Sequence, residues 1–154
     1  MTILLWAVPF FIITMLIEWR LTEGRPVRGY EAKDSAANLT MGLGNLALMF
    51  TVKAATLGIF LVVYEYRVFD LPVDTWWVWA LLIPAEDFFF YWCHRTGHEV
   101  RFFWAAHVNH HSSRTFNLST ALRQSWTGPL TNWVFWLPLP LLGFHPVLIL
   151  VAQS

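Results

Sequence analysis

Long apolar runs separated by short polar segments dominate this chain. A membrane-spanning helix needs about 20 mainly apolar residues, and about 17 are tolerated. Four segments reach or approach that length, namely Ile3 to Ile17, Leu39 to Tyr64, Trp76 to Cys93 and Trp126 to Val151. The pattern therefore predicts an all-α integral membrane helical bundle with about four transmembrane or re-entrant segments, formed by residues 1–154 as one membrane domain.

Prolines are expected to shape two of these segments. Pro84 predicts a kink in the third segment, because a proline inside a helix removes a backbone hydrogen bond. The fourth segment is broken by three prolines into either a bent span or a re-entrant hairpin, at Pro138, Pro140 and Pro146. The first segment lacks a basic leader and a small-residue cleavage site, so we expect a retained anchor helix and not a secretory signal.

Composition supports the membrane assignment. The chain is 56% hydrophobic and 13% charged, with ten tryptophans and a mean hydropathy of +0.48. These values lie outside the range of ordinary soluble domains. The formal net charge of zero argues against nucleic acid as a partner. A single cysteine, Cys93, allows no internal disulfide.

Five of the six histidines follow the third apolar segment directly. They form an HxxxH pattern and then an HxxHH pattern, at His94, His98, His107, His110 and His111. Residues four apart on a helix lie one turn above each other, so His94 and His98 would share a face if the third helix continues through them. A second helix would bring His107 and His111 together in the same way. Neutral imidazole is a common ligand of iron, zinc and copper, so the patterns predict a metal site at a membrane surface.

Carboxylates inside the third segment are further candidates. Ionisable residues at membrane depth are costly and usually face the bundle interior. Asp87 lies two turns before His94 on the same face, and we therefore weigh it above Glu86 as a catalytic or ligand residue. The alternative is that both carboxylates lie near the interface and pair with an arginine.

Two plainer interpretations compete with the metal site. An isolated histidine such as His145 is most simply a hydrogen-bonded structural residue. The histidine stretch could also be a basic interfacial loop, because four arginines surround it, at Arg95, Arg101, Arg114 and Arg123. That interpretation explains the arginines and leaves the histidine spacing unexplained.

The basic residues predict an orientation. The loop from Arg20 to Asn38 and the histidine stretch each carry four basic residues, whereas the loop from Glu65 to Asp74 carries only Arg67. By the positive-inside rule, the first two face the cytoplasm and the third lies outside. The predicted protein is thus an integral membrane protein with a cytoplasmic histidine-rich cap.

The stretches Asp87 to His98 (DFFFYWCHRTGH) and His107 to Ser112 (HVNHHS) resemble the fatty acid hydroxylase and sterol desaturase superfamily. The segment Asn117 to Ser125 (NLSTALRQS) is most similar to the alkylglycerol monooxygenase branch. The resemblance is specific from about Glu86 to Trp126, and upstream it rests on hydropathy alone.

The resemblance implies a membrane enzyme with a non-haem di-iron centre held by the five clustered histidines on the cytoplasmic side. Such an enzyme uses dioxygen to hydroxylate or desaturate a fatty acid, sterol or ether lipid, with a reduced pterin or a cytochrome b5-type protein as electron donor. The family places a further histidine box after the next membrane segment, and the sequence ends at Ser154 before one. Residues 1–154 are then either a portion of a longer protein or a degenerate member of the family. We expect the former, an N-terminal portion that does not turn over substrate alone.

Other functions fit the sequence less well. A membrane metal-binding or transport protein without oxygenase activity is the main alternative, but transport predicts ligands spread over several spans near the midplane. A zinc peptidase would need a second histidine after His98-Glu99 to complete HExxH, and the chain lacks it.

Overall fold

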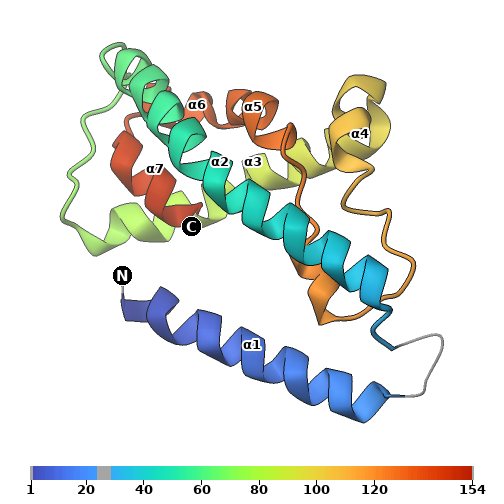
Figure 1. Cartoon of the computed structure of the whole chain (residues 1–154). Coiled ribbons are helices and arrows are strands. Elements are labelled where there is room, and N and C mark those ends of the chain that lie inside the picture. Colours follow the sequence, from blue (N-terminus) through green and yellow to red (C-terminus); the bar gives the residue numbers. More distant parts are fainter. Residues whose placement is uncertain (1, 24–28, 154) are drawn as a thin grey trace. The chain divides into compact units, whose positions relative to one another are not determined.

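The computed structural model describes residues 2–23 and 29–153, and none of these residues forms a strand (Figure 1). The predicted all-helical class is therefore confirmed. In chain order the elements are α1 (Thr2–Thr22), α2 (Ala32–Tyr64), α3 (Trp76–Glu99), α4 (Arg101–His107), the 3₁₀ helix η1 (Leu118–Leu122), α5 (Gly128–Asn132), the 3₁₀ helix η2 (Trp133–Trp136), α6 (Pro138–Leu142) and α7 (Pro146–Ala152).

Helix α2 is the candidate membrane-spanning helix. Its first turn is capped by the Glu31 carboxylate, which accepts hydrogen bonds from the backbone N–H groups of Lys33 at 3.2 Å and Asp34 at 2.8 Å. Among the described residues it is the one helix long and apolar enough to cross a membrane, judged by length and composition. Its 33 residues correspond to about 50 Å at 1.5 Å per residue, which exceeds a hydrocarbon core of about 30 Å. The polar first turns of α2 therefore extend beyond the apolar run that begins at Leu39.

The chain divides into two compact units. Unit 1 comprises residues 1–46 and 108–125, and unit 2 comprises residues 47–107 and 126–154. In unit 1, the Glu18 carboxylate of α1 accepts hydrogen bonds of 2.7 Å from the Leu118 N–H of η1 and from the Tyr30 hydroxyl. Its interior is polar and includes Asp34, Asn38, Asn117 and Ser119, which are all buried.

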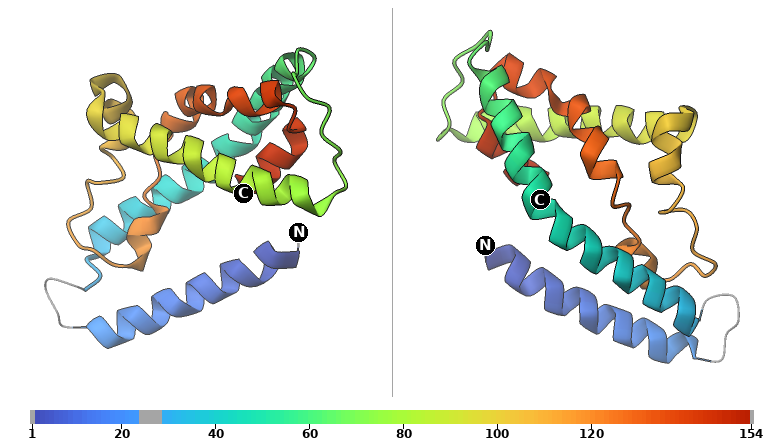
Figure 2. Two further views of the ribbon diagram at one scale, coloured as in Figure 1. Left: turned by 180° about the vertical axis from the view of Figure 1, so that it is seen from behind. Right: turned by 45° about the horizontal axis from the view of Figure 1, so that its top comes forward.

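Unit 2 has an apolar interior built around α3. Figure 2 shows α4 at the carboxyl end of α3 and the short helices α5 to α7 beside it. Five apolar side chains are completely buried there, namely Phe60, Val78, Leu82, Leu139 and Ile149. They come from α2, α3, α6 and α7, so this core fixes the helix whose carboxyl end carries the first histidine motif.

Prolines divide the fourth apolar segment as the sequence predicted. Pro138 and Pro146 stand at the first residue of α6 and α7, a position where the missing N–H costs no helical hydrogen bond. Helix α6 ends at Gly143, whose φ of +104° lies in the left-handed region. Helix α3 runs through Pro84 as one element, and the kink expected there stays a prediction.

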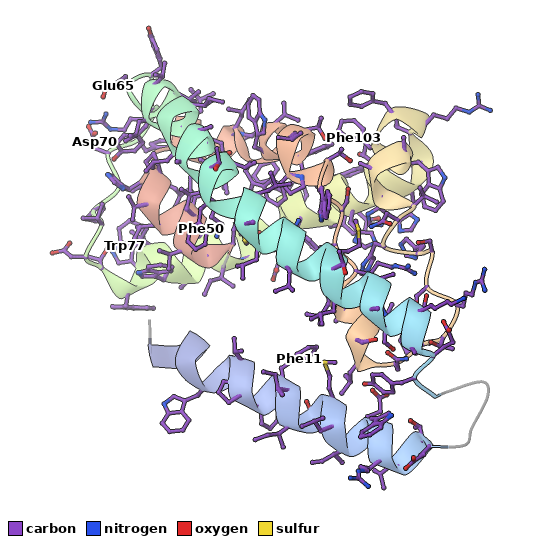
Figure 3. All side chains as sticks on the ribbon, in the orientation of Figure 1. Phe11, Phe50, Glu65, Asp70, Trp77 and Phe103 are labelled. Carbon is purple, nitrogen blue, oxygen red and sulfur yellow. The ribbon has the colours of Figure 1, made fainter. Side chains whose placement is uncertain are left out.

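Large apolar side chains cover the outside of the helices. Figure 3 shows Phe50 on α2 and Trp77 on α3, which are 75% and 37% exposed, and in unit 1 the α1 residues Phe10 and Leu21 are 69% and 71% exposed. Soluble monomers rarely expose contiguous apolar surfaces of this kind. These surfaces are consistent with a helical membrane protein.

Candidate metal centre

The first histidine motif lies on the last turns of α3. The helix runs through His98 to Glu99, as predicted, so His94 and His98 are one turn apart on one face. Their Nε2 atoms are 3.0 Å apart, and their ring centroids are 4.9 Å apart. The sequence pattern therefore predicted this pair correctly.

Helix α4 brings a third histidine to the same place. The chain leaves α3 at Val100, turns, and forms the short helix that ends at His107. The Nε2 atom of His107 lies 3.2 Å from that of His98, and its ring centroid is 4.8 Å from that of His94. The ligand nitrogens of these three residues all lie within 4.8 Å of one another.

A glycine makes this approach possible. Gly97 is buried between the two histidines of α3, and a Cβ atom at this position would lie 3.3 Å from Cγ of His107. The glycine of the HRTGH sequence thus lets the His107 ring contact the helix backbone directly. Its position inside the first motif was the only sequence signal for this role.

The donor set fits a metal ion. Two nitrogens bound at about 2.1 Å and about 90° apart on one ion are about 3.0 Å from each other. The observed separations of 3.0 and 3.2 Å match that arrangement. Imidazole nitrogens suit iron, zinc and copper, so the geometry of His94, His98 and His107 supports a transition-metal site without selecting one metal.

Two aromatic side chains pack against the three rings. Phe90 packs edge-on against His94 with 5.8 Å between ring centroids, and the Trp104 ring centroid lies 5.7 Å from that of His98. The Trp104 centroid is also 6.3 Å from that of His107. Each imidazole therefore has an aromatic neighbour, and the His98 side chain is still exposed.

The second histidine motif departs from expectation. His107 and His111 were predicted to share a helix, but α4 ends at His107 and residues 108–111 form turns. Backbone bonds link the His111 N–H to the Val108 carbonyl and the Ser112 N–H to the Asn109 carbonyl. The Ser112 hydroxyl also donates to the Asn109 carbonyl at 2.7 Å, and such local bonds compete with helix continuation.

His110 and His111 belong to unit 1. Their ring centroids are 5.1 Å apart, and Nδ1 of His110 lies 3.1 Å from the backbone carbonyl oxygen of Arg123. This contact connects the second motif to the NLSTALRQS segment.

Asp87 and Glu86 of α3, the two carboxylates weighed from the sequence, have different surroundings. Asp87 is exposed, and it is not among the clustered ligand-type side chains found within the described residues. Glu86 is half-buried, and its Oε1 accepts a hydrogen bond of 3.2 Å from the Trp136 indole N–H. The interior of unit 2 therefore holds Glu86, the carboxylate that was weighed lower.

His145 lies apart from the cluster. Its Nδ1 accepts a hydrogen bond from the Val147 N–H at 3.3 Å and so caps α7. Its ring also packs edge-on against Tyr64, with 5.3 Å between centroids. The structural role expected for this histidine agrees with these contacts.

Asp34 in unit 1 belongs to none of the sequence motifs. Its side chain is 5% exposed and lies 3.1 Å from Nη1 of Arg123, and it also accepts hydrogen bonds from three groups just after the second motif, at Ser113, Arg114 and Thr115. Burial alone would raise the pKa of Asp34, but these donors and the Arg123 charge outweigh it and lower the pKa below its ordinary value. An acidic residue in the first turn of a helix is common, so no sequence pattern indicated this role.

Comparison with known proteins finds one matching family and several relatives that share one name. Residues 79–154 match the family described as fatty acid hydroxylase. Alkylglycerol monooxygenase from Homo sapiens is 41% identical over 141 residues, which cover 88% of this chain and 31% of that protein. The proteins of the same name from Danio rerio and Xenopus tropicalis are each 35% identical, over 141 and 129 residues that cover 31% and 28% of their lengths. The chain thus spans about a third of these relatives, and no solved structure matches it significantly.

Proposed function

We propose that the protein is a membrane-bound non-haem di-iron oxygenase acting on lipid C–H bonds, because residues 79–154 match the fatty acid hydroxylase family. We further propose an ether lipid as the substrate class, because the similar proteins are named alkylglycerol monooxygenases. Dioxygen would be the co-substrate, and a reduced pterin or a cytochrome b5-type protein would supply electrons.

The observation that carries this proposal is the convergence of three imidazoles. His98 Nε2 lies within 3.2 Å of the Nε2 atoms of both His94 and His107. Three histidines brought together by two helices, with ligand nitrogens that all lie within 4.8 Å of one another, form a donor set that suits a transition-metal ion. We propose that these three residues hold iron and that His110 and His111 are ligands as well.

When bound, iron supplies the dioxygen activation that protein side chains cannot perform. The chain's own residues position the ligands. Gly97 sets the distance between the His107 ring and α3, while Phe90 and Trp104 pack against the rings of His94 and His98. Exposed apolar side chains on α3, such as Phe88 and Leu81, would face the acyl chains from which a lipid substrate arrives.

We propose that the histidine motifs face the cytoplasm, where soluble electron donors are available. The basic residues near them support this orientation through the positive-inside rule. With Cys93 replaced, a cysteine at position 112 should react with a membrane-impermeant reagent only after the cells are opened, whereas one at position 74 should react in intact cells. Labelling at position 112 in intact cells would contradict the orientation.

Metal analysis of the full-length protein tests the proposed centre. Protein expressed with sufficient iron and purified without oxygen should retain iron, and the combined His94→Ala and His107→Ala substitutions should remove it. The control is His145→Asn, which changes a histidine outside the cluster and keeps an acceptor for the Val147 N–H, so it should retain iron. Stoichiometric zinc with no iron would support a metal-binding protein of another class.

Lipid-dependent oxygen consumption tests the reaction class on the same preparations. It should require an alkylglycerol and either a reduced pterin or a reduced cytochrome b5-type donor, and the double histidine variant should show none. Oxygen consumption that does not depend on any lipid would contradict the proposed activity.

A further inference from the structure

The second histidine motif is held by a hydrogen-bond network inside unit 1. The ring of His110 contacts the Arg123 backbone, and the Arg123 guanidinium contacts Asp34 on the first turn of α2. Asp34 and His110 are far apart in sequence, yet this one intervening residue connects them.

The contact with Arg123 determines which nitrogen of His110 carries a proton. A backbone carbonyl oxygen can only accept a hydrogen bond, so at 3.1 Å the Nδ1–H of His110 donates to it. The proton then resides on Nδ1, and Nε2 keeps its lone pair. Histidines that bind metals commonly donate their other ring N–H to a carbonyl or carboxylate, which fixes the ring orientation.

Asp34 fixes the residue that supplies this carbonyl. Its Oδ1 lies 3.1 Å from Nη1 of Arg123, and the two side chains are only 5% and 11% exposed. The Arg123 N–H also donates to the Thr120 carbonyl at 3.0 Å. The Arg123 backbone is therefore held from both the side chain and the main chain.

Asp34 also holds the segment that follows His111. The Ser113 and Thr115 hydroxyls donate to Oδ2, and the Arg114 N–H donates to Oδ1 at 3.3 Å. One buried carboxylate thus binds the chain on both sides of the loop between Ser113 and Arg123. A carboxylate is suited to this task because it has about four acceptor sites and no donor.

We propose that Asp34 is a positioning residue for His110, one of the proposed iron ligands: through Arg123 it fixes the Nδ1–H tautomer and the ring orientation of His110, and so fixes the nitrogen, Nε2, that His110 offers to a metal. The metal-binding part of this inference rests on the proposed function. The tautomer part concerns the metal-free protein and can be tested without any metal.

The first test is ¹⁵N NMR of histidine-labelled, metal-free, full-length protein. The His110 ring, assigned by its loss in His110→Ala, should give the Nδ1–H pattern in the parent protein and an averaged tautomer pattern in Asp34→Ala. The control is Glu31→Gln, which changes a neighbouring exposed carboxylate that binds only α2 backbone N–H groups, and it should leave the pattern unchanged. An unaltered His110 pattern in Asp34→Ala would overturn the inference.

The second test is a double-mutant cycle on Fe(II) affinity, measured anaerobically by competition with a chelator. Asp34→Ala should weaken binding about tenfold, at the lower end of the range for residues that orient a ligand. In a His110→Ala background the same substitution should have no further effect, because its target is absent. An equal loss in both backgrounds would assign Asp34 a general structural role and overturn the inference.

Two outcomes separate this inference from the proposed function. If His94→Ala abolishes iron binding while Asp34→Ala changes neither affinity nor tautomer, the metal centre stands and the inference fails. If no histidine substitution affects iron binding, the proposed function fails, and the tautomer measurement still decides the role of Asp34. Should Asp34→Ala not fold, Asp34→Asn is measured in both tests, because it preserves side-chain volume and removes the charge that holds Arg123.

Discussion

Substitution of Gly97 by alanine should separate metal binding from stability. An added Cβ atom would lie 3.3 Å from Cγ and 3.5 Å from Cδ2 of His107. The 3.3 Å distance is a few tenths of an ångström shorter than ordinary carbon–carbon contact, which is about 3.5–4.0 Å. The His107 ring must therefore move away from α3, and its Nε2 moves with it relative to His94 and His98.

The size of the effect follows from the tolerance of metal coordination. Metal–ligand distances hold to within about 0.2 Å, and misplacement of a reacting group by about 1 Å can cost about a hundredfold. A shift of a few tenths of an ångström should then weaken Fe(II) binding about three- to tenfold, or about 0.6–1.4 kcal/mol. Alanine stabilises a helix interior by about 0.5–1 kcal/mol relative to glycine, so the thermal unfolding midpoint should not fall.

Gly58 offers a matched control. It lies inside α2, and a Cβ atom there would have nothing within 4 Å. Gly58→Ala should leave Fe(II) affinity unchanged when both variants are measured by chelator competition in the full-length protein. Equal Fe(II) affinities for Gly97→Ala, Gly58→Ala and the parent protein would refute the assigned role of Gly97.

Three further predictions concern stability, each measured by thermal unfolding in detergent. Gly143→Ala should destabilise the protein by more than about 2 kcal/mol, because φ of Gly143 is +104° and a Cβ atom there would lie 2.0 Å from the Phe69 carbonyl oxygen. An unchanged unfolding midpoint would contradict this prediction. Leu82→Ala should lower the free energy of unfolding by about 2–5 kcal/mol because Leu82 is fully buried. Leu81→Ala, at a position 53% exposed, should lower it much less. Similar losses of stability in the two variants would refute the packing argument. Since the Asp34 pKa is lowered in the folded protein, its carboxylate stabilises the fold at neutral pH, and this contribution should be lost as pH falls below the ordinary aspartate pKa of about 4; Asp34→Asn should lack this component, and identical pH profiles would contradict it.

The sequence predicted the local parts of the site well. The HxxxH spacing requires only that α3 continue beyond its apolar run, and the helix does continue to Glu99. The division of the last apolar segment at Pro138 and Pro146 was equally local, because proline acts on its own backbone.

Predictions that depended on tertiary contacts fared worse. Spacing alone placed His107 and His111 on one helix, but hydrogen bonds among Asn109, Ser112 and their neighbours end α4 and form turns. The position of Glu86 around α3 also could not show that it accepts a hydrogen bond from Trp136. Which face of α3 is covered depends on how the last apolar segment folds against it. The contacts of Asp34 join residues about 80 positions apart, and no sequence period connects them.

X-ray absorption at the iron edge of the full-length protein tests directly whether the clustered histidines are ligands of iron. We predict nitrogen or oxygen neighbours at about 2.0–2.2 Å with the multiple-scattering signature of several imidazoles. Any iron retained by His98→Ala should show a reduced imidazole contribution. His145→Asn should give the spectrum of the parent protein. Iron without imidazole neighbours, or an imidazole signal unchanged by His98→Ala, would contradict the claim that these histidines form the metal centre.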